Sequence, residues 1–370
     1  MRTIFILTTI IFAWLIGCKK PYSPSVISSN RSMLVVEGNL NAGADSTTLR
    51  LTRTFKLDDT ARLIAENNAQ LTIEGRDNSV RSLSGSGNGY YTSSNLNLII
   101  GNEYRLRIIT SGGNEYLSDY VKARITPDID SVGWDRDITG AHVYVNTGDP
   151  SGNTVYYRWN YDETWEIRSY YYSRFVYENG GVRPRLLPAE DVSVCWKNDQ
   201  SRQIILANSK SLTQDIIYKK PIVTIPSGSE KFQVRYSILL RQYSLDKNAY
   251  DFFEIMKKNT EEIGSIFSPQ PSEIRGNIHN VNDLSEAVIG YVTVSEEKQK
   301  RVFITRPTQW DFSLSCTSID VPKMADSINY YFGGYQYVPY DEGPTVYLGT
   351  EPYCADCTIR GGVTTKPSFW

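Results

Sequence analysis

Histidine is almost absent from this sequence, and its scarcity narrows the chemistry that the chain can perform. The 370 residues include two histidines, His142 and His279. Neither stands in an H-E-x-x-H motif or in a Cys/His nucleophile pair. The G-x-S-x-G and Walker A motifs are missing as well, and the glycine-rich "GSGNG" at 85–89 links strand-like stretches and opens no helix. We therefore predict a protein that is not an enzyme and that holds no metal or cofactor.

An excess of charge of either sign is also missing. Lys and Arg number 39 and Asp and Glu 41, which gives a formal net charge of −2. A chain with balanced charge lacks the excess of positive charge that binds nucleic acid or an anionic membrane surface. We interpret the acidic pair Glu190-Asp191 as solvated surface. We interpret "GDPSGN" (148–153) as a plain turn, because it lacks the dense Asp and Asn ladder of calcium loops.

The start of the chain carries a short apolar run. A positive start is followed by apolar residues from 3 to 15, too few for a comfortable membrane-spanning helix but typical of a secretory signal. The motif Leu15-Ile16-Gly17-Cys18 is similar to the bacterial lipobox, in which cleavage precedes the cysteine. The similarity implies a signal peptide over 1–17 and a lipid anchor on Cys18. Residues 18–30, rich in Pro and Ser, are then a flexible tether.

Tyrosine and short alternating stretches are abundant. The chain has 26 Tyr, and its aromatic content of 12% suits antiparallel sheets. Strand-like stretches separated by Gly-rich turns recur from 33 to 124, as in "TTLRLTRT", where Leu49 and Leu51 share one face. We predict tandem antiparallel β-sandwich domains of the immunoglobulin-like kind. The first spans 31–126, and a larger β-rich domain spans 127–370 and includes strands at 287–295.

One segment of the second domain breaks the strand pattern. Residues 244–264 space their apolar side chains as a helix does, and Gly264 is a suitable C-terminal stop. Ser244 or Asp246 is a suitable N-cap. The pattern predicts a single helical insertion near 245–263, packed on the second sheet.

Four cysteines remain beyond Cys18: Cys195, Cys316, Cys354 and Cys357. An even number in an exported chain favours disulfides over a zinc site, and three connectivities are possible. Cys354-Ala355-Asp356-Cys357 has redox spacing but lacks the βαβ setting of such motifs. We predict that the disulfides clamp the C-terminal tail to the second domain.

Two stretches, 169–181 and 330–349, concentrate tyrosine. Adjacent residues of a strand point to opposite faces, so these tyrosines cannot all be buried in one core. Exposed Tyr provides rigid amphipathic area for a ligand or a partner protein, whereas cross-strand aromatic packing is the alternative interpretation. The candidate contact residues are Tyr170, Tyr171, Tyr172, Tyr330, Tyr331, Tyr335, Tyr337 and Tyr340.

Several blocks of the mature chain resemble one known family. These blocks are "LVVEGNL" (34–40), the stretch from 235 to 280, "AVIGYVTVS" (287–295), "KRVFIT" (300–305) and "CADCTIRGGVTTKPSFW" (354–370). The family is the domain of unknown function 4249, and the resemblance covers roughly residues 30–370. It implies a Bacteroidota outer-membrane lipoprotein encoded near TonB-dependent receptors. The resemblance assigns no catalytic or ligand-binding residues to this chain.

The resemblance and the composition together lead to a functional expectation. We expect a non-enzymatic outer-membrane lipoprotein that works with a TonB-dependent receptor in uptake or envelope assembly. The alternative is a cell-surface adhesin that binds a glycan or a peptide. Surface lipoproteins of that phylum usually carry acidic residues after the lipidated cysteine, whereas Lys19 and Lys20 stand here. The sequence is therefore compatible with an anchored protein that faces the cell surface and with one that faces the periplasm.

Overall fold

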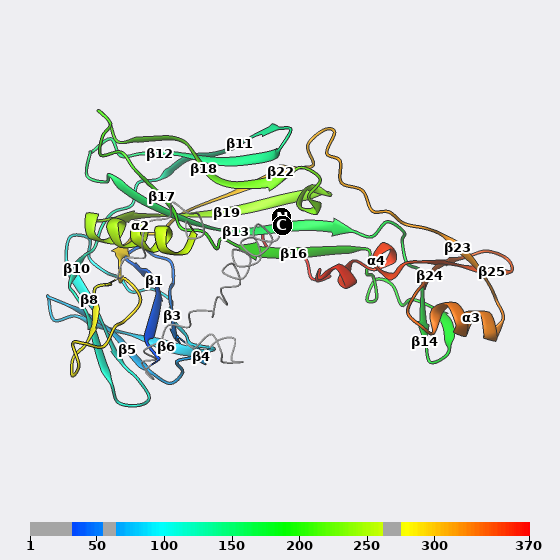
Figure 1. Ribbon diagram of the computed structural model, residues 1–370, viewed down its shortest axis with the longest axis horizontal. Coiled ribbons are helices and arrows are strands. Elements are labelled where there is room, and N and C mark those ends of the chain that lie inside the picture. Colours follow the sequence, from blue (N-terminus) through cyan, green and yellow to red (C-terminus); the bar gives the residue numbers. More distant parts are fainter. Residues whose placement is uncertain (1–31, 55–63, 262–274) are drawn as a thin grey trace, which may run out of the picture. The chain divides into compact units, whose positions relative to one another are not determined.

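A computed structural model describes residues 32–54, 64–261 and 275–370, and in it residues 33–370 form one compact, mainly β unit. The predicted signal peptide (1–17), the predicted lipidation site Cys18 and the predicted tether lie outside the described residues. No helix of the described part is long and apolar enough to cross a membrane. The predicted fold class, tandem antiparallel β-sandwiches, is confirmed (Figure 1).

The first sandwich is built from a sheet in the order β1-β3-β7-β6-β5-β8-β9-β20, with β4 beside β3 and β10 beside β8. Its core buries the predicted face with Leu49 and Leu51, and also Leu71 and Ile73 of β5. The strands are β1 (Leu34–Gly38), β2 (Leu40–Asn41), β3 (Thr47–Arg53), β4 (Ile64–Ala65), β5 (Gln70–Gly75), β6 (Val80–Gly87), β7 (Tyr90–Ser93), β8 (Glu103–Ile109), β9 (Glu115–Ser118), β10 (Val121–Lys122) and β20 (Ile278–Asn280).

A segment from the second half of the chain returns to this sandwich. β20 pairs with β9, and β21 (Val294–Ser295) pairs in parallel with β2. Val288, Val292 and Val294 are buried in the first core. The prediction that 287–295 belongs to the second sandwich is therefore wrong. The alternation of apolar residues correctly identified a buried face, but it carries no information about which sheet covers that face.

The second sandwich places the sheet β11-β12-β18 against the sheet β16-β13-β19-β22, with β17 beside β13, around an aromatic core. Gln242 joins the two layers: its side chain accepts from Trp159 Nε1 at 2.8 Å and donates to Thr147 Oγ1 at 2.9 Å. The strands are β11 (Ile129–Asp137), β12 (Gly140–Gly148), β13 (Tyr156–Arg168), β16 (Val194–Gln200), β17 (Ile205–Asn208), β18 (Ile216–Pro226), β19 (Arg235–Leu245) and β22 (Lys298–Thr305).

The predicted helical insertion is confirmed as α2 (Lys247–Glu261). Ala249, Phe252 and Phe253 are buried against the sheet, as their spacing predicts. The N-cap is Asp246, whose carboxylate accepts the Ala249 N–H at 2.8 Å, while Ser244 lies within β19. The predicted stop at Gly264 lies outside the described residues.

The remaining elements form a third group, which we name the C-terminal lobe (residues 169–193 and 315–360). It contains the hairpin β14 (Phe175–Glu178) and β15 (Gly181–Pro184), the sheet β23 (Ile319–Pro322), β25 (Val346–Thr350) and β24 (Val338–Glu342), and the helices α3 (Ala325–Phe332), α4 (Pro352–Ala355) and η2 (Cys357–Arg360). The short helices of this lobe were not predicted from the sequence. α3 has 8 residues and α4 has 4, which is too short for a helical period to emerge from the sequence.

Candidate functional site

The C-terminal lobe is fastened by two disulfides, as predicted. Cys316 is bonded to Cys354, and Cys195 in β16 is bonded to Cys357 at the start of η2. The second bond ties the tail to the second sandwich, where Val363 also exchanges backbone hydrogen bonds with Trp196 at 2.8 and 2.9 Å. The predicted clamp of the C-terminal tail is confirmed, and the structure selects one of the three connectivities.

The first tyrosine stretch is held against this disulfide framework. The N–H groups of Tyr170 and Tyr171 both donate to the Cys354 carbonyl, at 2.8 and 3.0 Å. The Tyr171 ring stacks on Tyr340 with centroids 4.2 Å apart, and Tyr170 meets Tyr171 edge-on at 4.9 Å. Tyr170 and Tyr172 remain 60% and 47% exposed. These two rings are therefore presented to solvent from a rigid base.

Tyr340 does not share this exposure. It is 9% exposed, and its hydroxyl lies 2.9 Å from Ser318 Oγ. Burial also raises the pKa of its stacking partner Tyr171. Tyr340 is thus a packing residue, because its ring in β24 stacks on the Tyr171 ring that precedes β14, and we no longer include it among the candidate contact residues.

The second tyrosine stretch begins on a helix. Tyr330 and Tyr331 lie on α3, so the strand argument for their exposure is wrong, although Tyr330 is 80% exposed. Tyr335 follows the helix at 79% exposure. Tyr331 and Tyr337 are partly buried, with ring centroids 6.3 Å apart, and Tyr331 meets Tyr330 edge-on at 4.9 Å.

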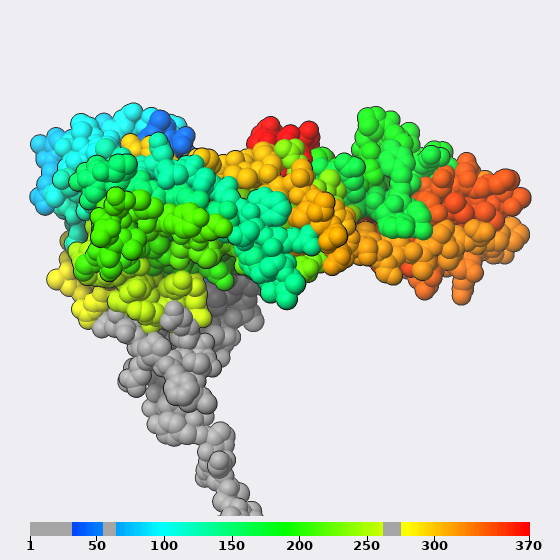
Figure 2. All heavy atoms as spheres, turned by 90° about the horizontal axis from the view of Figure 1, so that it is seen from above, coloured from blue at the N-terminus to red at the C-terminus, as the bar shows by residue number. Residues whose placement is uncertain are grey.

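The two tyrosine stretches are joined through a residue that the sequence reasoning did not select. Tyr177 in β14 donates to the Asn329 side chain on α3 at 2.8 Å, and its ring lies 6.3 Å from Phe332. Figure 2 shows the hairpin residues, in green, against the residues of α3 and its sheet, in orange. Within the first stretch, Tyr177 was not distinguishable from its neighbours, since only its position opposite α3 defines its role.

Arg183 pairs with two acidic side chains of the lobe. Arg183 donates to Glu178 at 2.8 Å and to Glu190 at 2.8 and 3.0 Å. The hydrogen bond from Arg183 and the Leu186 N–H lower the pKa of Glu190 to about 2. Paired charges leave the exposed tyrosine rings as the side chains best suited to contact a partner.

The histidines have structural contacts. The His142 ring on β12 lies 3.0 Å from Asp137 and 3.1 Å from Thr224 Oγ1, and its hydrogen bond lowers the pKa of Asp137. His279 lies in β20 and pairs with Leu117 of β9. The prediction that the chain is not an enzyme stays a prediction.

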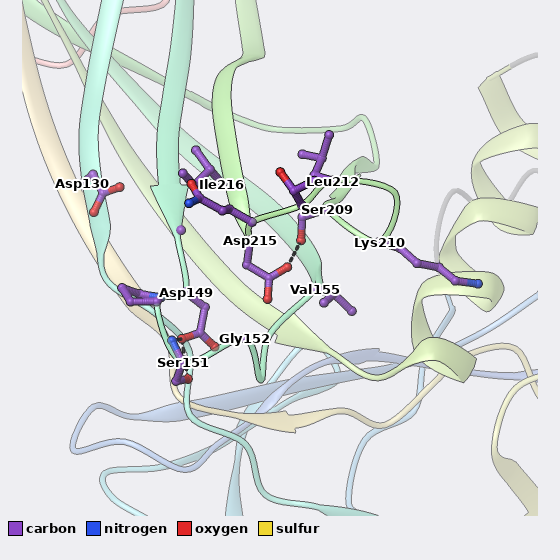
Figure 3. A pocket seen from close by; sticks show the side chains of 14 residues that line it. Asp130, Asp149, Ser151, Gly152, Val155, Ser209, Lys210, Leu212, Asp215 and Ile216 are labelled. Carbon is purple, nitrogen blue, oxygen red and sulfur yellow. Dashed lines mark hydrogen bonds between the residues drawn. The ribbon is translucent and has the colours of Figure 1, made fainter.

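A cavity of about 820 Å³ lies beside the turn at 148–153. Figure 3 shows Asp130, Asp149 and Asp215 around it. The Asp149 carboxylate accepts from Ser151 N and Oγ, at 2.9 and 2.6 Å, and from the N–H groups of Asn153 and Thr154, at 3.1 and 2.8 Å. These donors lower the pKa of Asp149 and outweigh its partial burial, which acts in the opposite direction. The segment forms a turn, and the described residues contain no cluster of His, Cys, Asp and Glu suited to a metal.

Comparison with known families matches residues 19–301 to the family described as "Domain of unknown function (DUF4249)". The match begins directly after Cys18 and ends before the C-terminal block that the sequence resemblance included. No curated protein matches the chain. Among solved structures, the chicken interferon gamma receptor alpha chain is similar at 12% identity, covering 75% of this chain and 98% of that chain. Its TM-score of 0.16 is too low to carry an argument about fold or function.

Proposed function

Since this chain belongs to the domain of unknown function 4249 family, whose name assigns no activity, we propose its function from its own residues. It is a non-enzymatic lipoprotein of the outer membrane in Bacteroidota, anchored through Cys18. Its C-terminal lobe docks on a TonB-dependent receptor and assists uptake or envelope assembly.

The observation that carries the proposal is the exposure of four tyrosines on a fastened lobe. Tyr170, Tyr172, Tyr330 and Tyr335 are 60%, 47%, 80% and 79% exposed. Tyr has few rotatable bonds, so it loses little entropy when a partner covers it, and it is enriched at protein interfaces. The two disulfides further reduce the entropy that is lost on binding, because they hold the lobe in an ordered conformation before a partner binds.

The test is co-purification of the receptor with variants of the full chain expressed in its host. The four-residue variant combines Tyr170→Ala, Tyr172→Ala, Tyr330→Ala and Tyr335→Asn. We expect it to lower receptor recovery at least about tenfold, since each aromatic side chain buried at an interface contributes about 1–2 kcal/mol to binding. Asn is chosen at position 335 because the backbone φ there is +55°.

The matched control is Tyr218→Ala. Tyr218 is 75% exposed but lies on β18, outside the lobe. Receptor recovery with this variant should equal that of the unchanged chain. Equal recovery with the four-residue variant, at unchanged melting temperature, would contradict the proposal.

The alternative function is an adhesin that binds a glycan or a peptide. The observation that favours it is the same set of exposed rings, because aromatic faces also stack on sugar rings. A glycan array probed with the full chain separates the two functions. The adhesin is favoured if the unchanged chain binds specific glycans and the four-residue variant does not. Receptor recovery should then be the same for both.

A further inference from the structure

A second cavity, of about 660 Å³, is lined by lysines from three separate elements. Lys220 comes from β18, Lys257 from α2, and Lys231 from the short helix η1 (Glu230–Phe232). Buried apolar and aromatic side chains form part of its wall, including Tyr161 at 8% exposure and Ile222 at 4%. A site with such walls has a lower dielectric constant than water, which strengthens any charge interaction inside it.

Two of these lysines lack an acidic partner. Lys231 is paired with the buried carboxylate of Glu163 at 2.5 Å, and Asp199 on the rim lies 3.4 Å from Arg202. No hydrogen bond or ion pair joins the side-chain ammonium group of Lys220 or Lys257 to another residue of the described part of the chain. The cavity therefore holds two uncompensated positive charges.

A nearby carboxylate on α2 is already engaged. Glu261, one helical turn after Lys257, accepts the N–H of Ile204 at 2.6 Å. On the preceding turn, Glu254 pairs with Lys258 at 3.2 Å. Thus the acids beside Lys257 on the described part of its helix have other hydrogen-bond partners, although helical spacing alone would place them within its reach.

The two unpaired lysines also repel one another. Burial lowers the pKa of Lys220, and the positive charge of Lys257 lowers it further. Two like charges held together at a partly buried site cost free energy, and an anion placed between them removes that cost. The three lysines lie on three different elements, and no local sequence pattern links them. They are brought to one cavity by the packing of α2 against β13 and β17, of β17 against β18, and of η1 against β13.

We propose that this cavity binds a small ligand with at least two negative charges, carried by phosphate or carboxylate groups. Lys220 and Lys257 contact its anionic groups directly. Lys231 remains with Glu163 and contributes positive potential at the wall. This site is distinct from the tyrosine surface of the C-terminal lobe and does not depend on the function proposed for that surface.

The experiment is isothermal titration calorimetry on the full chain purified in detergent, at matched ionic strength. Pyrophosphate and citrate serve as the probes, so the two arms distinguish a phosphate ligand from a carboxylate ligand. We expect saturable binding of at least one probe. The double variant Lys220→Gln and Lys257→Gln should weaken that binding about tenfold or more, because it removes both charged hydrogen-bond donors to the anion.

The matched control is Lys219→Gln combined with Lys258→Gln. Lys219 and Lys258 are the sequence neighbours of Lys220 and Lys257, and their substitution changes the net charge by the same amount. Unlike Lys220 and Lys257, they form ion pairs, with Asp135 and Glu254. Binding should be retained in this control. The absence of binding of either probe to the unchanged chain, or an equal loss in both double variants, would overturn the proposal. Melting temperatures of both variants establish that they are folded.

Discussion

At the scale of single residues, hydrogen bonds to carboxylates hold the C-terminal lobe in place. Glu351 follows β25, and its carboxylate accepts from Thr317 N at 3.0 Å, Thr317 Oγ1 at 2.5 Å and Thr350 Oγ1 at 3.1 Å. These donors favour the charged form and lower the pKa of Glu351 to about 2. The segment after Cys316 is thereby joined to the strand that precedes Cys354.

This contact predicts a dependence of stability on pH. The pKa of Glu351 is lower in the folded chain than in the unfolded chain, where it has its ordinary value near 4.5. The unfolded chain therefore takes up the proton first. The stabilisation is complete above pH 4.5 and is lost as the pH falls toward about 2.

The measurement is thermal unfolding of the chain and of Glu351→Gln at neutral and at acidic pH. We expect the variant to melt at a lower temperature near neutral pH, and the difference to shrink at about pH 2. A difference that stays constant across this range would show that the charge of Glu351 does not stabilise the lobe. Glu342→Gln is a control, because the Glu342 carboxylate pairs with Lys323 and not with the segment that follows Cys316.

At the scale of elements, the returning segment completes the first sandwich through close backbone contact. Val36 N donates to Ile289 O at 2.8 Å, and Ile289 N donates to Leu34 O at 2.9 Å. Gly290 follows with φ +141°, and a Cβ built there would lie 2.3 Å from Val36 O. Only glycine can both adopt this conformation and approach β1 so closely.

We therefore predict that Gly290→Ala separates the returning segment from β1. The cost should be at least about 1 kcal/mol, since a side chain in a conformation that it cannot adopt is strained. Urea unfolding measures the free energy, and hydrogen exchange at Val36 N locates the change. The matched control is Gly112→Ala, where the nearest atom to a new Cβ is 4.0 Å away. An unchanged exchange rate at Val36 would contradict the prediction.

At the scale of the whole molecule, the two disulfides connect distant parts of the chain. Cys195 and Cys357 are 162 residues apart, and Cys316 and Cys354 are 38 apart. A disulfide restricts the unfolded chain, and a loop of the shorter length corresponds to a stabilisation of about 3–4 kcal/mol. The lobe has no large apolar core cluster of its own among the described residues, so it depends on these bonds more than the two sandwiches do.

Replacing Cys316 and Cys354 together with Ser should therefore loosen the lobe selectively. We expect faster hydrogen exchange at the N–H groups of Tyr170 and Tyr171, which donate to the Cys354 carbonyl. Exchange within β1 and β3 should not change, since the first sandwich does not include the lobe. Mass spectrometry of exchanged peptides makes both measurements in one sample. Equal acceleration in both regions would show that the bond stabilises the chain as a whole.

The spacing of apolar residues was sufficient to predict a buried face wherever that face follows the side-chain period of a single strand or helix. The alternation of Leu49 and Leu51 placed one face of β3 in a core, and the spacing of Phe252 and Phe253 located α2. The even number of cysteines indicated disulfides, because pairing in an exported chain depends on composition and compartment. Family membership was also readable from the residues alone.

The sequence by itself thus determined the class of the fold, the helix α2, the presence of disulfides and the places where tyrosine is concentrated. Only the tertiary structure decided the connectivity of Cys195 with Cys357, the burial of Tyr340 and the return of β21 to the first sandwich. It also placed Lys220 and Lys257 at the wall of one cavity. The physical reason is the range of the interactions. Side-chain period and composition act between neighbours in the chain, whereas pairing, exposure and charge repulsion depend on which distant segments the fold brings together.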